Sequence, residues 1–533
     1  MASVRVNKRD ISIAFDRLIV DARDDFWPDP YRYADLTSVK AEVVNEYVKV
    51  VNSMLSTNPI NPKTHSVYHW DVPKSNNVVR HAVLLNPFDR LVYHVLLNRL
   101  CRDIEPRLEK PRYSYRISKF NDKYLFGKKG VDHWLAFKAD ITDAVTTGKL
   151  KYLVSTDIAG FFEYVHLTDF RRQMENLTEK ENKPFVELLY AFLRKVAMSN
   201  HSGIPQNYDP SSYFCTAFLD FLDKDLLAKG LKHFRYVDDI KVACRTRKDA
   251  QLAIIEIIHS LRKMNLNVQS SKTQIWHETD PEFREFAKKF PPLLTAIDKA
   301  TESKDKDLIS SLLPKLLILT RTEMKKTPFD ERIFRACIRR IVKCHYFSNV
   351  KIPSLTSIVN RSFKLMTQMP GRSDTIVDFL SLYKNNKGVQ ERTFALIKDV
   401  IYFWQEMKLW ELLVKSTKIK VPAVLAYARK KLERGIGNPV MNLVLLCLGR
   451  HGNYNDRLHI ARLFEQQHSV YTRRHILIAI QEYRDRNEIY NRVLDGDDLL
   501  LISVVRHIRQ LAKPMYTYED PQIASQVAEG YEG

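Results

Sequence analysis

The sequence predicts an α+β domain of the ferredoxin-like, split βαβ type, followed by an all-helical region. Short runs rich in β-branched and aromatic residues, typical of strands, occur at 151–156, 234–237, 240–244 and 272–276. Segments with helical periodicity separate the first run, the middle pair and the last run. Strand, helices, hairpin, helix and strand is the order of a split βαβ sheet with helices on one side. From about residue 290 onward the strand-like pattern disappears.

The helices between the strands are predicted from the spacing of their apolar residues. Residues 184–199 and 212–228 have the pattern of helices between the first strand and the hairpin. After the hairpin, Thr246 to Asp249 resemble a capping box, a common helix start. Apolar residues then recur on one face from Ala250 to Leu261, which predicts a third helix.

Two adjacent acids, Asp238 and Asp239, separate the middle pair of strands, so we expect them at the tip of a hairpin. An Asp pair at a turn is by itself usually a solvated loop, because Asp is a common turn former. A third acid changes this interpretation. Asp157 ends the strand at 151–156, and neighbouring strands of one sheet would bring it to the hairpin. The sequence therefore predicts three carboxylates at one point.

Converging carboxylates of this kind suit metal-dependent chemistry on nucleotides. Joining a nucleotide requires in-line attack on a negatively charged phosphorus, and two Mg²⁺ ions roughly 3.5–4 Å apart can steady both the attacking and the leaving oxygen. Mg²⁺ prefers hard oxygen ligands and is held by one or two carboxylates together with substrate phosphates. We therefore expect Asp157 and Asp238 to bind two Mg²⁺ ions, or Mn²⁺ in their place, with Asp239 as an accessory catalytic carboxylate.

The motifs around these acids resemble the palm of reverse transcriptases. Asp157 followed five positions later by Phe162 is similar to the first palm motif, in which the aromatic ring occupies the space of a ribose 2′-hydroxyl. The resemblance implies deoxynucleotide substrates. Ser202 to Gln206 is similar to the second palm motif, which lies beneath the incoming nucleotide. Asn207 follows it where many relatives have Gly, which puts accommodation of a template in question, although Asn tolerates a positive φ.

The resemblance also assigns roles to residues outside these two motifs. Lys74 and Arg80 are similar to the fingers residues that grip the triphosphate, and the alternative is ordinary surface charge. Lys272 resembles the lysine that protonates the pyrophosphate leaving group. The resemblance also places Ile158 among the metal-binding residues. It places Tyr236, the first residue of the Tyr-Val-Asp-Asp tetrad, among the substrate-binding residues.

Whole-chain composition agrees with a protein that binds polyanions. The 533 residues contain 84 Lys and Arg against 63 Asp and Glu, a formal charge of +21. The 6 cysteines show no Cys-x-x-Cys spacing, so neither a zinc site nor a disulfide framework is indicated. The N-terminus lacks an apolar signal core, and no segment reaches the ~20 apolar residues that a membrane span needs. We expect a soluble protein with free thiols in a reducing cytoplasm.

Amphipathic segments of roughly 12–18 residues fill the second half of the chain. Their pairing resembles HEAT-like repeats, and an irregular helical bundle is the alternative. Examples are residues 307–320, 331–345, 391–407, 421–434, 439–450, 455–466, 470–483 and 498–512. The predicted segments of the whole chain are an N-terminal region with fingers (1–140), a palm (141–285), a HEAT-like region in place of a thumb (286–515) and a C-terminal tail (516–533).

A reverse transcriptase palm followed by a long helical region resembles the abortive-infection phage-defence enzymes of the AbiK type, including prophage-encoded relatives. This resemblance implies a homo-oligomer that polymerises dNTPs without a template, from a protein hydroxyl, into single-stranded DNA attached to the protein. The alternatives are a conventional RNA-templated reverse transcriptase and a non-enzymatic scaffold that binds nucleic acid. No priming residue is predicted, although five tyrosines lie in turn-rich or terminal segments: Tyr31, Tyr33, Tyr516, Tyr518 and Tyr531.

Overall fold

The computed structural model was obtained for all 533 residues, and it describes most of them. The residues that it does not describe are 1–4, 23–26, 28, 66, 75–77, 110–112, 115, 121–122, 127–129, 149, 198, 200, 289–290, 327–328, 349, 351, 354, 436–438 and 518–533, together with the side chains of 118–120, 123–126, 130–132 and 347–348. Within the described part of the chain, no helix combines the length and the apolar character needed to cross a bilayer.

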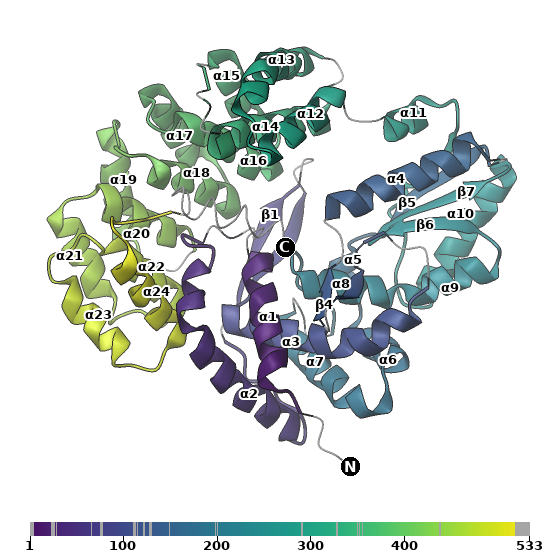
Figure 1. The fold of residues 1–533 in the computed structure, drawn as a ribbon, viewed down its shortest axis with the longest axis horizontal. Helices are drawn as coiled ribbons and strands as arrows, with labels where there is room; N and C mark the ends of the chain where they lie inside the picture. The colour runs from purple at the N-terminus through teal and green to yellow at the C-terminus, as the bar shows by residue number, and fades with distance from the viewer. Residues whose placement is uncertain are drawn as a thin grey trace. The chain divides into compact units, whose positions relative to one another are not determined.

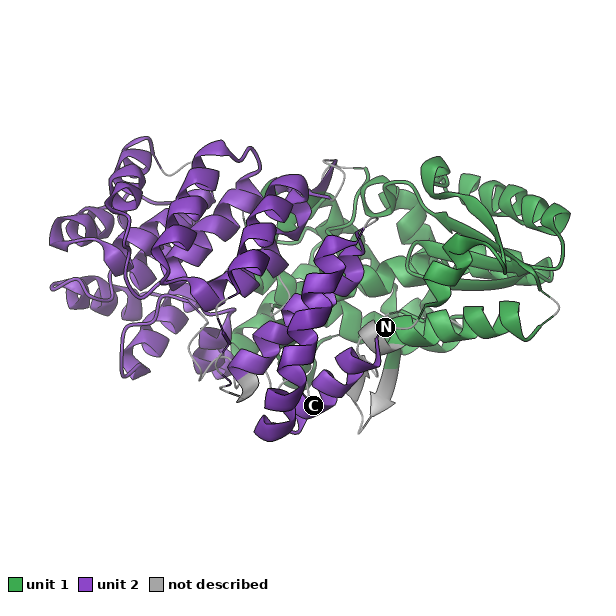
Figure 2. Cartoon of the chain, turned by 90° about the horizontal axis from the view of Figure 1, so that it is seen from above, with its two compact units in different colours: residues 1–24, 43–69, 81–289 green, residues 25–42, 70–80, 290–533 purple. Residues whose placement is uncertain are grey.

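The chain forms two compact units, coloured separately in Figure 2. The first unit comprises Met1–Asp24, Val43–His69 and His81–Lys289, and the second comprises Asp25–Glu42, Trp70–Arg80 and Phe290–Gly533. The first unit is α+β with small antiparallel sheets, and the second is largely helical. The limits of the four segments expected from the sequence remain a prediction.

Many of the elements that precede the helical region are labelled in Figure 1. In chain order they are α1 (Lys8–Asp21), η2 (Ala34–Val39), α2 (Lys40–Ser56), β1 (Tyr68–Pro73), β2 (Val79–Leu84), α3 (Pro87–Ile104), β3 (Ile117–Phe120), β4 (Lys123–Phe126), α4 (Gly130–Thr146), β5 (Tyr152–Asp157), α5 (Phe161–Tyr164), α6 (Leu167–Leu177), α7 (Lys183–Val196), α8 (Asp209–Phe218), α9 (Asp220–Ala228), β6 (Lys232–Tyr236), β7 (Asp239–Cys244), α10 (Arg247–Arg262), η5 (Ser270–Lys272), β8 (Gln274–His277) and α11 (Pro281–Ala287).

A four-stranded sheet in the order β6-β7-β5-β8 is the centre of the first unit. All three neighbouring pairs of strands are antiparallel. Helices α5 to α9 connect β5 to β6, and α10 connects β7 to β8, so the chain follows the β-α-β-β-α-β order expected of a split βαβ unit. The segment expected to form one helix at 212–228 is two helices, because the backbone departs from helical geometry at Leu219.

Helices cover both faces of this sheet, and not one face as the sequence suggested. On one face, Leu153 and Ala243 pack with Phe137 and Ile141 of α4 in a buried apolar cluster. Side chains alternate between the faces along each strand, so the buried residues next to them, such as Val154, point to the opposite face. Helix α10 contacts β5, β7 and β8 with a capping box at its start, as predicted.

The second unit is a stacked array of short helices. Its helices are α12 (Pro292–Glu302), α13 (Lys306–Lys325), α14 (Glu331–Ser348), α15 (Thr356–Gln368), α16 (Ser373–Leu380), α17 (Lys387–Asp399), α18 (Phe403–Lys415), α19 (Pro422–Glu433), α20 (Val440–His451), α21 (Tyr454–Leu463), α22 (Val470–Ala479), α23 (Arg486–Leu494) and α24 (Leu499–Gln510). The prediction of one helix at 391–407 was wrong, because α17 ends at Asp399 and a new helix begins at Phe403.

Helices α14, α16, α18, α20, α22 and α24 form a row in which each contacts the next. Each odd-numbered helix from α13 to α23 packs on the even-numbered helix that follows it, and Figure 1 shows the odd-numbered helices on the outer side of the row. The row is tight between α20 and α22. A Cβ atom at Gly449 would lie 2.3 Å from the carbonyl oxygen of Ala479, so only glycine fits there.

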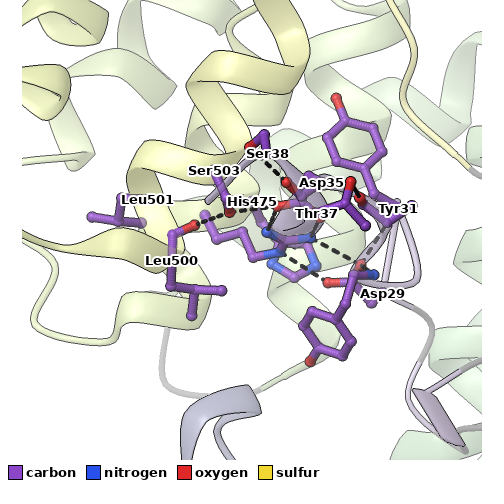
Figure 3. Close-up of polar contacts among 12 residues, drawn as sticks. Asp29, Tyr31, Asp35, Thr37, Ser38, His475, Leu500, Leu501 and Ser503 are labelled. Atoms are coloured by element: carbon purple, nitrogen blue, oxygen red, sulfur yellow. Dashed lines mark hydrogen bonds and ion pairs between the residues drawn. The ribbon is translucent and has the colours of Figure 1, made fainter. Parts of the chain in front are cut away.

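A segment from the N-terminal part of the chain closes the end of this array. Helix η2 packs on α24, and the acids Asp29 and Asp35 bind Arg474 of α22 (Figure 3). The guanidinium group of Arg474 is 0% exposed and pairs with both carboxylates, with Nε 3.0 Å from Asp29 and Nη2 2.7 Å from Asp35. Ser503 of α24 donates a further hydrogen bond to Asp35. This buried ion cluster links residues that are more than 400 positions apart in the sequence.

Candidate active site

Two neighbouring strands bring the three predicted acids together. Asp157 is the last residue of β5 and pairs in register with Asp239, the first residue of β7. Asp238 lies in the tight turn between β6 and β7, and its carbonyl oxygen accepts a hydrogen bond of 3.3 Å from the main-chain N–H of Ile158. The site is thus built at one edge of the sheet, as the spacing of the strands predicted.

The acids at this edge are half-buried and close enough to influence one another. Burial, together with the negative charge of Asp157, raises the pKa of Asp238 to about 7. Burial also raises the pKa of Asp239, while the ammonium group of Lys241 acts in the opposite direction. The Lys241 side chain is 5% exposed and pairs with Asp239.

Lys272 lies in the turn η5, directly before β8 and not within the strand as expected. The main-chain N–H of Gln269 donates to the carbonyl oxygen of Asp157 over 2.7 Å, which fixes this turn against the end of β5. The Lys272 ammonium group binds the Asp157 carboxylate. Burial lowers the pKa of Lys272, but the three neighbouring aspartates outweigh it and raise the pKa overall. Lys272 is therefore held as a cation next to Asp157.

The aromatic residue of the first motif and the turn of the second motif are in contact. The main-chain N–H of Ile204 donates to the carbonyl oxygen of Phe162 over 2.7 Å, and that of Gly203 donates to Val165 over 3.1 Å. Phe161 is buried and packs edge-on against the ring of Phe162, which is half-buried. The structure thus combines both sequence motifs into one surface next to Asp157.

Glycine is required at the start of this surface. Gly160 has a φ of 53°, in the left-handed region, and a Cβ atom there would lie 2.4 Å from the ring of Tyr164. At the other end, Asn207 has a φ of 69°, the conformation in which Asn is the least strained replacement for Gly. Gln206, directly before it, is half-buried.

Tyr236 is held from one side by aromatic residues of α4. Its ring lies 5.3 Å from that of Trp134 in an edge-on arrangement and 6.0 Å from that of Phe137. Burial raises the pKa of its hydroxyl group. Packing on α4 therefore explains the burial of much of the Tyr236 side chain. Contact of Tyr236 with a substrate stays a prediction.

Lys74 and Arg80 lie on the β1–β2 hairpin, where the main-chain N–H of Lys74 donates to Val78 over 2.7 Å. Both residues belong to the second compact unit, whereas the aspartates belong to the first, so their role in triphosphate binding stays a prediction.

The tyrosines considered for priming are not exposed where the structure describes them. Tyr31, Tyr33 and Tyr516 are 0%, 1% and 3% exposed. The hydroxyl group of Tyr31 donates to the carbonyl oxygen of Met515, and that of Tyr516 to Glu482. Turn-rich sequence suggested accessible hydroxyl groups, but the second unit encloses these three rings. Tyr518 and Tyr531 lie outside the described residues.

Three residues for which the sequence predicts no role support the turn that carries Asp238: Ser114, Asp223 and Arg235. Ser114 accepts a hydrogen bond from the main chain of Val237, and Arg235 is a fully buried cation paired with Asp223. One signal was available for Arg235. A charged residue between apolar strand residues requires a buried partner, although the sequence does not say which acid provides it.

The donor set fits divalent metal ions of the magnesium type. In the described residues, no group of three or more His, Cys, Asp or Glu side chains forms a cage that could hold a metal ion. Mg²⁺ does not need such a cage, because one or two carboxylates with substrate phosphates and waters are enough. Asp157 and Asp238 are such a pair, and their mutual repulsion is relieved by a cation.

Paired acids at adjacent strand ends, at the edge of a sheet of this topology, are the arrangement that metal-dependent nucleotidyltransferases use on phosphate esters. Residues 72–307, less than half of the chain, match the family model described as reverse transcriptase (RNA-dependent DNA polymerase), and this match identifies the protein as a nucleotidyltransferase. Members of the family act on nucleotides and nucleic acid and generally use divalent metal ions.

Solved structures with detectable similarity include two telomerases. The chain is 11% identical to telomerase from Candida albicans in complex with a fragment of telomeric RNA, covering 71% of this chain and 68% of that chain with a TM-score of 0.31. It is 12% identical to apo telomerase from Candida tropicalis, covering 80% and 71% with a TM-score of 0.29. No curated protein sequence matches significantly.

Proposed function

We propose that the protein is a DNA polymerase of a bacterial anti-phage abortive-infection system, which joins dNTPs without a template and from a protein hydroxyl. The observation that carries the polymerase activity is the in-register pairing of Asp157 with Asp239 beside Asp238. In this proposal the enzyme is a cytoplasmic homo-oligomer whose product is single-stranded DNA attached to the protein.

The chain's own residues have distinct tasks at this site. Asp157, Asp238 and the main chain of Ile158 would hold two Mg²⁺ ions, which supply positive charge to the attacking and leaving oxygens when bound. The ring of Phe162 occupies the position of a ribose 2′-hydroxyl and selects deoxynucleotides. Lys272 holds a proton at Nζ, next to Asp157, from which a pyrophosphate leaving group can be protonated.

Two features support synthesis without a template. Asn207 places a side chain where the resembled family usually has glycine close to a base pair, and its φ of 69° shows that the glycine conformation is kept. A stacked helical array follows the palm in the chain, where a polymerase normally has a small thumb that grips duplex product. The row of paired helices supports the HEAT-like interpretation over an irregular bundle.

The second candidate function is a conventional reverse transcriptase that copies RNA. The family match favours this second candidate, because the matching family model describes RNA-dependent DNA polymerases. This candidate requires an added primer and template, and its product is complementary to the template.

One incorporation assay separates the two candidates. Purified protein is incubated with labelled dNTPs and Mg²⁺ but no nucleic acid, and the products are treated with protease or nuclease before electrophoresis. We expect label that migrates with the protein, is released by nuclease, and becomes free DNA after protease. Asp238→Ala should abolish it, because the remaining acids cannot replace the turn carboxylate.

A matched control is Asp225→Ala on α9, which removes a carboxylate of the same unit that pairs with the surface residue Lys263. This variant should incorporate label like the unmodified protein. Incorporation that appears only with an RNA template and primer would establish the second candidate. Incorporation that survives Asp238→Ala would refute both.

A further inference from the structure

The turn that carries Asp238 contains a strained residue. Val237 has a φ of 54°, in the left-handed region that β-branched side chains rarely adopt. Its side chain is 7% exposed, so packing retains it in the protein interior. Strain of this kind persists only where surrounding contacts fix the backbone, and it is concentrated at functional sites.

Both main-chain polar groups of Val237 are fixed by side chains. The N–H donates to the hydroxyl oxygen of Ser114 over 3.0 Å, and the carbonyl oxygen accepts from Nη1 of Arg235 over 3.0 Å. Ser114 comes from the segment before β3, and Arg235 from strand β6. The peptide units on either side of Val237 are therefore oriented by contacts outside the turn.

Arg235 is itself immobilised. Its Nε donates to Asp223 Oδ1 over 2.9 Å, and its Nη2 binds both Asp223 and the carbonyl oxygen of Thr216, the latter over 3.1 Å. The side chains of Arg235 and Asp223 are 1% and 2% exposed. Only a guanidinium group has enough donors in a rigid plane to reach all three partners at once, because a lysine ammonium group is a compact point charge.

We propose that Arg235, held by Asp223, is a positioning residue that keeps Val237 in its left-handed conformation and thereby fixes the Asp238 carboxylate for catalysis. This inference rests on the proposed function, since it requires Asp238 to be catalytic. It assigns no chemical step to Arg235, which acts through the backbone of the turn.

The test is a double-mutant cycle between Arg235→Lys and Val237→Asn in the full-length protein. Arg235→Lys should lower kcat for dNTP incorporation by at least about tenfold and leave KM for dNTP within about twofold, a difference of about 1.4 kcal/mol in the barrier. Asn adopts a positive φ readily, so residue 237 then no longer depends on Arg235. In the Val237→Asn background, Arg235→Lys should therefore lower kcat by less than about threefold.

Two further measurements separate positioning from a purely structural role. Hydrogen exchange of the segment 234–240 should accelerate in Arg235→Lys and slow again in the double variant, whereas the melting temperature reports overall folding. Arg90→Lys is the matched control, because Arg90 is also a buried arginine of the first unit, paired with Asp21. Val237→Asn should not restore any kcat that Arg90→Lys loses. Where Val237→Asn does not fold, Val237→Gly provides the same freedom at residue 237.

The outcomes are distinct from those of the proposed function. Unchanged kcat in Arg235→Lys, with activity still abolished by Asp238→Ala, overturns this inference alone. An equal loss of kcat with and without Val237→Asn also overturns it, because Arg235 then acts independently of the turn backbone. Activity that survives Asp238→Ala overturns the proposed function itself.

Discussion

Replacing Arg474 by alanine should destabilise the helical unit strongly. The guanidinium group is 0% exposed, and its two partners, Asp29 and Asp35, are 2% and 0% exposed. Removing one partner of a buried ion pair costs about 3–5 kcal/mol, because the charge left behind has no compensation. Here two carboxylates are left behind. At about 2–4 °C per kcal/mol for a unit of this size, the melting temperature should fall on the order of 10 °C.

The loss of stability in Arg474→Ala should also depend on pH, and the charges of the buried ion cluster determine the direction of that dependence. Burial alone would raise the pKa of Asp29, but Arg474 outweighs it and holds the pKa below its ordinary value. In the unmodified protein this pairing stabilises the fold at pH values above the ordinary pKa and is lost as pH falls through the lowered pKa. In Arg474→Ala the largest influence that lowers the pKa of Asp29 is gone, and burial is opposed by His475 and by the main-chain N–H of Tyr33, so the pKa of Asp29 should rise. The variant should therefore lose less stability at pH 5 than at pH 8.

Differential scanning calorimetry at pH 5, 6.5 and 8 measures both effects. Arg429→Ala is the matched control in the same unit, because Arg429 pairs with Asp456 but is 42% exposed, and such pairs contribute about 0–1 kcal/mol. Adding Asp29→Asn and Asp35→Asn to Arg474→Ala should restore part of the loss by removing the uncompensated charges. A decrease in melting temperature of less than about 2 °C for Arg474→Ala would contradict the reasoning. An equal decrease at pH 5 and pH 8 would contradict the predicted pH dependence.

Two further substitutions have defined outcomes. Phe162→Ala should raise incorporation of ribonucleotides relative to deoxynucleotides by at least about tenfold, about 1.4 kcal/mol, in a competition assay, and an unchanged ratio would exclude the ring as the selective group. Gly449→Ala should lower the stability of the helical unit by about 1–3 kcal/mol, because the new Cβ atom meets the carbonyl oxygen of Ala479 at 2.3 Å. A melting temperature equal to that of the unmodified protein would show that α20 and α22 separate without cost.

The part of the site that depends on local pattern was predictable from the sequence. Alternating apolar residues define β5, β6 and β7, and the acids at their ends have only one edge of the sheet at which to meet. Residues that act through long-range contacts were not predictable. Ser114 lies more than 100 positions from Val237, and nothing local in its segment indicates that it binds the backbone of that residue.

Helix ends in the second half of the chain could not be predicted for a different reason. The apolar spacing continues across 391–407, so periodicity alone predicts one helix. The structure ends α17 at Asp399, and Ile401 in the connection is 79% exposed. No proline or glycine marks this break. The array fixes it, because α17 packs on α18, and two antiparallel neighbours require a turn between them.

The conformation of Val237 shows why the turn that carries Asp238 depends on the rest of its unit. Asn or Gly would adopt a φ of 54° without strain, but such a turn would form whether or not its surroundings were folded. With valine, the turn is stable only when Ser114 and Arg235 both reach it, and Arg235 reaches it only when Asp223 of α9 is in place. The position of Asp238 is thereby made conditional on the assembly of two separate parts of the unit. A strained residue at this point makes the site precise because its geometry is imposed from outside the turn.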